Sequence, residues 1–361
     1  MDWQGRFARY CATGGADHVL VSRLDDIRWL TGFTGGTAEL VVHRGDAAGW
    51  LLVDGRYSAR ARAELDASGV PVEIVEMTGA SAVEDHLATW GIGRLGIDAD
   101  AVSVARMRRL SRVVELVDEH DHLDDLRRVK EPAELALIER AASIAGQALM
   151  HVVADGMCGR TERQVRNRLD HLMLEAGADG TGFDTIVATG PNGARPHHEP
   201  GDTVIEAGHG VVVDMGALVG GYRSDMTRTV TVGQVGADYA EMHELVRRAQ
   251  RAAVDAVAAG VVGRHVDAAA RGMFERHGVG HEFTHGTGHG VGLRIHETPI
   301  LSPRCEAVLR EGEVVTVEPG LYRGGIGGVR IEDLVVVTGT GCRILTSTPK
   351  DLSCPPSPRT T

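Results

Sequence analysis

Neither a long apolar run nor a pair of cysteines at Cys-x-x-Cys spacing occurs in the 361 residues of this sequence. A membrane-spanning helix needs an apolar segment of about 18 residues or more, so we expect no membrane span and no membrane partner. The stretch MDWQGRFARY at the N-terminus lacks the apolar core of a signal peptide. We therefore expect a cytoplasmic protein.

Cysteines are few, odd in number and scattered along the chain. The spacing argues against both a zinc ribbon and a disulfide framework. It predicts free thiols in a reducing compartment. The five cysteines are Cys11, Cys158, Cys305, Cys342 and Cys354.

Basic residues are also too few for a nucleic-acid surface. The sequence has 38 Lys and Arg against 50 Asp and Glu, and its formal net charge is −12. A nucleic-acid surface needs clustered Lys and Arg, so we expect no nucleic-acid partner. Much of the acidity serves solvation, although part of it could belong to a metal site.

Residues 1–125 alternate short apolar runs with polar helical stretches, which predicts an N-terminal α/β domain. A formal GxGxxG match at Gly91–Gly96 precedes a predicted strand instead of joining a strand to a helix. We therefore expect no dinucleotide site. The predicted strands lie in DHVLVS, AELVVH, GWLLVD, VEIVE and RLGIDAD, and a helix in GRYSARARAELDASG ends at Gly69.

Residues 126–345 form a second predicted domain, separated from the first by the charged junction LDDLRRVKEP. Two helices followed by strands occur twice along it, which predicts an α+β domain with an internal pseudo-duplication. We expect residues 346–361, with the Pro-containing end SCPPSPRTT, to be a disordered tail. The predicted helices run from Pro132 to the residue before Gly156, from the N-cap Thr161 to Ala176, and over about 238–259 and 265–277.

Two aspartates in the segment VVVDMGALVGGYRSDMTRT present an electrostatic problem. Val211–Met215 and Tyr222–Val232 are predicted strands. If a tight turn centres on Val219-Gly220, Asp214 and Asp225 face each other across the hairpin. Two carboxylates that close repel by about 4 kcal/mol at an effective dielectric constant near 20.

Further acidic groups and several histidines stand in the second half of the domain. Glu318 and Glu332 also adjoin apolar strand runs, and HGTGHGVGLRIHETP supplies histidines. If the four carboxylates converge, two divalent cations would neutralise them. Oxygen ligands with one imidazole suit Mn²⁺, Co²⁺ or Zn²⁺.

A rival zinc motif is present in HEFTH, residues 281–285, which is a literal HExxH. That pattern binds zinc when both histidines share a face of a helix. Gly278, Gly280, Gly286 and Gly288 flank it, and such a segment is a poor helix. We therefore interpret His281 as a surface residue.

Several segments resemble a known family of metallopeptidases. DMGALVGGYRSDMTRT, GTGHGVGLRIHETP, TVEPGLY and GVRIEDLVVV are similar to motifs of the aminopeptidase P, prolidase and methionine aminopeptidase family. The resemblance covers about residues 130–345 and implies the pita-bread fold. LDDIRWLTGFTGGTAELVV and DGRYSARA resemble the N-terminal domain of the aminopeptidase P, prolidase and creatinase-like members.

Carried over residue by residue, the resemblance implies a dinuclear metal centre with Mn²⁺ favoured. Asp225 and Glu332 match the bridging positions, a metal-bridging hydroxide would be the nucleophile, and Glu318 would shuttle protons. The implied ligands are Asp214, Asp225, His289, Glu318 and Glu332.

The resemblance also implies residues that contact the substrate. His197 and His296 match the catalytic histidines that hydrogen-bond the tetrahedral intermediate and the leaving nitrogen. The neighbour of His197, His198, complicates that assignment. His285 would contact substrate or support the site, and Arg330 would hold a metal ligand.

The implied activity is hydrolysis of the bond between an N-terminal residue and proline. Xaa-Pro dipeptidase is slightly favoured over Xaa-Pro aminopeptidase, and in a dipeptidase Arg304 or Arg330 would hold the product-side carboxylate. The implied substrates are Xaa-Pro dipeptides or short peptides with proline second, and the implied assembly is a homodimer. The alternatives are a hydrolase for another small C–N substrate and a non-catalytic binding relative.

Overall fold

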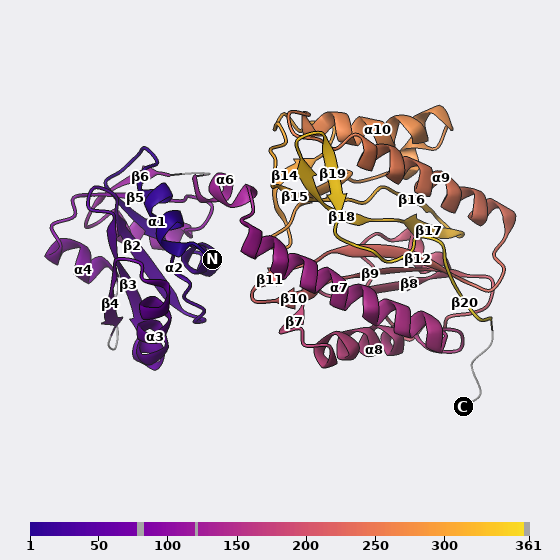
Figure 1. Cartoon of the computed structure of the whole chain (residues 1–361), viewed down its shortest axis with the longest axis horizontal. Coiled ribbons are helices and arrows are strands. Elements are labelled where there is room, and N and C mark those ends of the chain that lie inside the picture. Colours follow the sequence, from indigo (N-terminus) through magenta and orange to yellow (C-terminus); the bar gives the residue numbers. More distant parts are fainter. Residues whose placement is uncertain (78–82, 120–121, 357–361) are drawn as a thin grey trace. The chain divides into compact units, whose positions relative to one another are not determined.

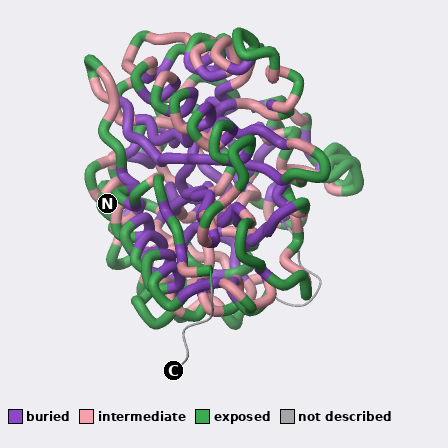
Figure 2. Tube along the Cα trace, turned by 90° about the vertical axis from the view of Figure 1, so that its right-hand side faces the viewer, coloured by how far each residue is buried: buried purple, intermediate pink, exposed green. Residues whose placement is uncertain are grey.

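The structure is a computed structural model, and it describes residues 1–77, 83–119 and 122–356 (Figure 1). The chain divides into two compact units, Met1–Arg127 and Arg128–Thr361. The division falls close to the domain boundary expected at residue 125. Buried residues concentrate in the interior strands, and exposed residues lie on outer helices and loops (Figure 2). None of the described helices combines the length and apolar character of a membrane span.

The N-terminal unit is built on one mixed sheet, in the order β4-β3-β2-β1-β5-β6. β1 pairs antiparallel with β2 and parallel with β5, and its residues Val19 and Leu20 are buried. The predicted α/β domain is confirmed. The strands are β1 (His18–Val21), β2 (Ala38–His43), β3 (Ala48–Asp54), β4 (Val72–Met77), β5 (Arg94–Ile97) and β6 (Glu115–Asp118). The helices are α1 (Trp3–Cys11), α2 (Leu24–Thr31), α3 (Ser58–Ser68), α4 (Val83–Thr89), α5 (Val104–Leu110) and α6 (His122–Arg128).

The C-terminal unit places strands between two pairs of helices (Figure 1). One core lies between α7 (Pro132–Asp155), α8 (Glu162–Glu175) and the first set of strands. The other lies between α9 (Ala237–Asp255), α10 (Gly263–Arg276) and the second set. This arrangement confirms the pseudo-duplicated α+β domain.

The strands of this unit form sheets in the orders β11-β10-β7, β20-β12-β9-β8, β14-β13-β15-β18-β19 and β16-β17. Antiparallel pairs dominate these sheets, and the parallel pair β12–β20 is an exception. The first set comprises β7 (Gly180–Thr181), β8 (Ile186–Thr189), β9 (Gly210–Met215), β10 (Ala217–Val219), β11 (Tyr222–Arg223) and β12 (Met226–Val232). The second comprises β13 (Gly288–Gly290), β14 (Glu297–Leu301), β15 (Val314–Val317), β16 (Gly320–Arg323), β17 (Gly327–Arg330), β18 (Asp333–Thr338) and β19 (Gly341–Ile344). The last strand, β20 (Leu352–Cys354), joins the sheet of the first set.

The first two helices of the unit begin where their capping residues predict. Pro132 opens α7, and the side chains of Glu131 and Glu134 each accept a hydrogen bond from the other's backbone N–H. Thr161 and Gln164 make the same reciprocal cap at the start of α8. These caps satisfy amide groups that have no partner within the helix.

The register of the predicted hairpin is wrong by two residues. Val219 pairs with Tyr222 and Asp214 pairs with Thr227, so the turn centres on Gly220-Gly221. Both glycines have positive φ, at 56° and 84°, which a two-residue hairpin turn of this type requires at both central positions. A shift of two residues keeps each side chain on its face of the sheet.

The expectation of a disordered tail is wrong for residues 346–356. Leu352–Cys354 forms β20, which pairs parallel with β12 and buries Leu352 and Cys354 in the first core. The open edge of β12 supplies the hydrogen-bond partners that the short strand lacks alone. Residues 357–361 of the expected tail lie outside the described residues.

Candidate metal centre and active site

Four carboxylates and one imidazole from separate strand ends converge on one point. Oxygen atoms of Asp214, Asp225 and Glu332 all lie within 4.8 Å of one another. His289 Nε2 lies 3.6 Å from Asp225 Oδ2 and 3.4 Å from Glu318 Oε1. Asp214 comes from β9, His289 from β13, and Asp225, Glu318 and Glu332 from residues that directly flank strands. The structure therefore brings together the five residues expected to bind metal.

Asp225, Glu318 and Glu332 carry raised pKa values. Burial raises the pKa of Asp225 well above its ordinary value, and the charges of Glu332, Asp214 and Glu318 raise it further. Burial, followed by the charges of Glu318 and Asp214, also raises the pKa of Glu332. Burial raises the pKa of Glu318 to about 7, despite the opposing charge of Arg330. The cluster thus has a surplus of negative charge that needs a counter-charge.

Two oxygens of the cluster are buried without a partner. Asp214 Oδ1 and Glu332 Oε1 accept no hydrogen bond from any described residue. Leaving such an acceptor unpaired costs about 1–3 kcal/mol, and more when it is charged. Divalent cations prefer oxygen ligands, and a single imidazole extends the choice to Mn²⁺, Co²⁺ and Zn²⁺. The donor set therefore fits divalent metal ions.

The ring of His289 is oriented toward the carboxylates. Nδ1 donates to Gly290 O at 3.1 Å, which leaves the lone pair on Nε2 facing Asp225 and Glu318. The hydroxyl of Thr316 accepts from the backbone N–H of His289 at 3.0 Å. A Cβ on Gly288 would lie 1.9 Å from Thr316 O, so glycine permits this close approach of the two strands.

Arg330 links several members of the cluster. It is 2% exposed, and its Nη2 donates to Asp214 Oδ2 at 2.7 Å. Nε donates to Thr227 Oγ1 at 3.0 Å, and that hydroxyl donates to Glu332 Oε2 at 2.8 Å. Arg330 therefore fixes the orientation of two of the expected ligands, one directly and one through a threonine.

Tyr322 continues this chain of contacts to His285. Its hydroxyl accepts from Arg330 Nη1 at 2.9 Å and donates to His285 Nε2 at 2.8 Å. His285 Nδ1 donates to Gly286 O at 2.7 Å, which fixes the tautomer. Burial, with the charge of Arg330, lowers the pKa of His285 to about 4. His285 is therefore a neutral hydrogen-bond acceptor at neutral pH.

A cavity of about 410 Å³ opens over the cluster and contains both expected catalytic histidines. His197 and His296 line it, and the ring of His296 stacks edge-on against His289 with 4.5 Å between centroids. His198 instead pairs with Glu162 at 2.8 Å. The structure thus places His197, and not His198, in the lining of the cavity over the carboxylates. His281, in a short 3-10 turn (Gly280–Glu282), is exposed.

Comparison with known proteins identifies the family. The model for metallopeptidase family M24 matches residues 136–339, and the Creatinase/Prolidase N-terminal domain matches residues 5–129. The chain belongs to metallopeptidase family M24. Such a peptidase binds divalent metal ions, and its second unit has the pita-bread fold that the resemblance implied.

Relatives of this M24 chain span nearly its whole length. It is 35% identical over 338 residues to an Xaa-Pro dipeptidase of Pyrococcus horikoshii, covering 93% of this chain and 94% of the relative. The structure of an Xaa-Pro dipeptidase from Bacillus anthracis superposes with a TM-score of 0.91 at 34% identity, covering 98% and 99% of the two chains. An X-Pro aminopeptidase from Thermotoga maritima gives a TM-score of 0.86 at 32% identity, covering 96% and 99%.

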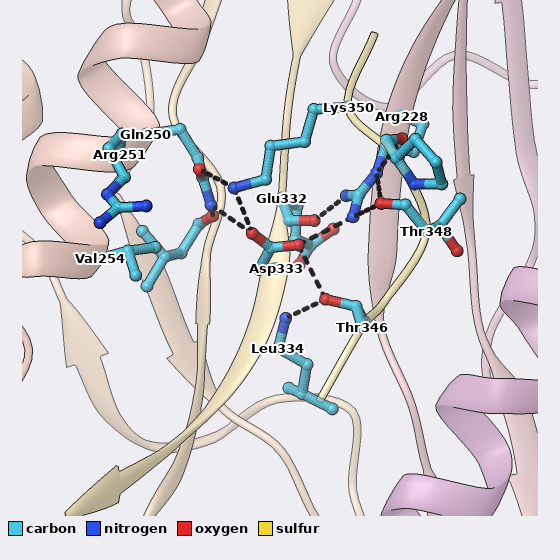
Figure 3. Close-up of polar contacts among 12 residues, drawn as sticks. Arg228, Gln250, Arg251, Val254, Glu332, Asp333, Leu334, Thr346, Thr348 and Lys350 are labelled. Carbon is cyan, nitrogen blue, oxygen red and sulfur yellow. Dashed lines mark hydrogen bonds and ion pairs between the residues drawn. The ribbon is translucent and has the colours of Figure 1, made fainter. Parts of the chain in front are cut away.

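A buried ion network in this M24 unit fastens the C-terminal segment beside Glu332 (Figure 3). Arg228 donates to the carbonyl of Glu332, to Thr348 O at 3.1 Å and to Asp333 Oδ1 at 2.8 Å. Lys350 Nζ pairs with Asp333 Oδ2 at 2.6 Å. Burial opposes ionisation of Asp333, but Arg228 and Lys350 outweigh it and lower its pKa. Arg228 and Lys350 thus bind the two carboxylate oxygens of Asp333, the residue that follows Glu332.

Sequence reasoning missed Tyr322 and the role of the C-terminal segment. Tyr322 stands in the quoted motif TVEPGLY, and β16 pairs with β17 so that Tyr322 opposes Gly328 and Gly320 opposes Arg330. Residues two apart on paired strands share a face. Tyr322 therefore lies on the same face as Gly320 and its partner Arg330. This two-residue spacing in TVEPGLY was the sequence signal that could have placed Tyr322 beside Arg330.

Proposed function

We propose that this M24 chain hydrolyses the peptide bond between an N-terminal residue and proline, with dipeptides slightly favoured. The observation that carries the proposal is the convergence of Asp214, Asp225, His289, Glu318 and Glu332 under one cavity, with two carboxylate oxygens left unpaired. Its relatives named as Xaa-Pro dipeptidases support the substrate class.

Asp214, Asp225, His289, Glu318 and Glu332 would hold two divalent cations, with Mn²⁺ favoured. When bound, such ions supply an activated water and polarise a substrate carbonyl. Arg330 keeps Asp214 and Glu332 in place for this task through the hydrogen bonds described above.

Side chains around the cavity would handle the substrate and its protons. An Xaa-Pro bond is a tertiary amide without N–H, and its nitrogen, like that of any amide, must gain a proton to leave as an amine. His197 and His296 line the cavity and can donate hydrogen bonds to the tetrahedral intermediate and to that nitrogen. Glu318, whose Oε1 lies near His289 Nε2, would carry the proton between water and leaving group.

A metal-replacement assay tests this function. Protein stripped with chelator should hydrolyse neither Ala-Pro nor Ala-Pro-Ala, and Mn²⁺, Co²⁺ or Zn²⁺ added separately should restore turnover, with Mn²⁺ the most effective. Cleavage of Ala-Pro alone would mean a dipeptidase, and cleavage of both peptides an aminopeptidase. Folded, metal-loaded protein that cleaves neither peptide would contradict the proposal and favour another small C–N substrate. The implied homodimer stays a prediction, which light scattering on purified protein tests.

A further inference from the structure

A recess continues from the active-site cavity past His296. It has a volume of about 510 Å³ and shares Phe183, Asp184, Ile295 and His296 with the cavity lining. Two arginines, Arg223 and Arg294, line it as well. With Asp184 as the one acidic residue of this lining, the recess carries a net positive charge.

Arg223 is incompletely paired within the protein. Its Nε and Nη1 atoms are buried and donate to no acceptor in the described part of the chain. Its backbone N–H donates to Gly292 O at 3.0 Å, which ties β11 to the loop between His289 and His296. Buried guanidinium nitrogens without acceptors are costly, so this position favours an anionic ligand.

A second recess, past His197, lacks this property. Its arginines already have acceptors: Arg163 Nε lies 3.0 Å from Asp202 Oδ1, and Arg166 Nε donates to Asn167 Oδ1 at 2.7 Å. Glu199 and Asp184 line the same recess and balance the two positive charges. Of these two recesses, the one beside His296 therefore suits an anion better.

The two arginines expected to hold a product-side carboxylate do not suit that task. Arg330 already directs its donors at Asp214, Thr227, Tyr322 and Pro196 O. The exposed Arg304 is not among the residues that line the cavity.

We propose that Arg223, in the recess it shares with Arg294, binds the terminal carboxylate of the residue that follows the scissile bond. This inference rests on the proposed function. In a dipeptide only the C–N, N–Cα and Cα–C bonds separate the scissile carbonyl carbon from the carboxylate carbon. A substrate whose leaving nitrogen lies by His296 therefore places its carboxylate toward the recess. Arginine binds a carboxylate through two parallel charge-assisted hydrogen bonds.

Kinetics on Ala-Pro and Ala-Pro-amide test the role of Arg223. The amide keeps the scissile bond and removes the negative charge. Arg223→Leu should raise KM for Ala-Pro by roughly 10- to 100-fold, the range expected for a charge-assisted hydrogen bond, and change KM for the amide little. Arg223→Lys, which keeps the charge, should lie in between. Arg163→Leu, in the other recess, should leave both KM values unchanged. Equal effects of Arg223→Leu on both substrates would overturn the inference.

Binding to metal-free protein gives a second readout that needs no turnover. L-Proline should raise the melting temperature of the wild type more than L-prolinamide does, and Arg223→Leu and Arg223→Lys should reduce this difference. An equal response of the variants and the wild type would overturn the inference. If the wild type hydrolyses neither Ala-Pro nor its amide, the proposed function fails, and the proline shift still decides whether Arg223 binds the carboxylate.

Discussion

Arg330 orients several residues of the site through hydrogen bonds to their neighbours. Arg330 contacts no expected metal ligand other than Asp214 directly, yet it also orients Glu332 through Thr227 and His285 through Tyr322. The type of each residue could be matched to a motif in the sequence. The contacts between them could not, because they depend on which strands pair.

Removing one hydroxyl from this chain of contacts tests its role. Tyr322→Phe removes one acceptor of Arg330 Nη1 and the hydroxyl that His285 Nε2 contacts, so we expect a loss of about 1–3 kcal/mol in unfolding free energy and a fall in kcat/KM for Ala-Pro. Tyr239→Phe is the matched control, because Tyr239 is also buried and donates to Gly328 O at 2.8 Å. The control should lose similar stability in urea titration but keep its kcat/KM. Equal kcat/KM values for the two variants would show that Tyr322 is only structural.

At the scale of helices and strands, apolar periodicity and capping residues predicted β1–β5 and α3 of the N-terminal unit and α7–α10 of the C-terminal unit, but not α1, α2, α4–α6 or β6. The starts of α7 and α8 follow from Pro132 and Thr161. The hairpin register did not follow, because an apolar pattern with period two is unchanged by a shift of two residues. For the same reason, the predicted register was wrong but still placed Asp214 and Asp225 on the correct face of the sheet. β20 was missed because a strand of three residues has too short an apolar pattern to be recognised in the sequence, and it forms by pairing with the edge of β12.

The fastening of the C-terminal segment gives a prediction at this scale. Lys350→Met removes a partner of the buried Asp333, so we expect unfolding free energy to fall by about 1–3 kcal/mol. Arg251→Met is the control, because Arg251 lies nearby (Figure 3) but both it and its partner Asp255 are exposed. This loss should be within about 0.5 kcal/mol. Urea titration at neutral pH measures both. Equal losses would mean that the ion network adds nothing to the attachment.

At the scale of the whole molecule, the fold carries an electrostatic cost that its metal centre would offset. The net stability of a domain is only about 5–15 kcal/mol, so a buried group of like charges takes up a significant part of it. The raised pKa of Asp225 expresses this cost. The sequence indicated the repulsion between the aspartates, but only the structure shows that Glu318 and Glu332 contribute to it as well.

The effect of pH on metal-free protein measures this cost. Because folding raises the pKa of Asp225, the stability of the wild type falls as pH rises through the folded-state pKa. Asp225→Asn removes that charge, so the metal-free variant should melt at a higher temperature than the wild type at pH 7.5. The difference should shrink at acidic pH, where Asp225 is protonated. The low pKa of His285 acts in the opposite direction but is common to both proteins, so it cancels in the comparison. Added Mn²⁺ should raise the melting temperature of the wild type and leave the variant nearly unchanged. A difference that does not depend on pH would show that the carboxylate repulsion does not limit the stability of this fold.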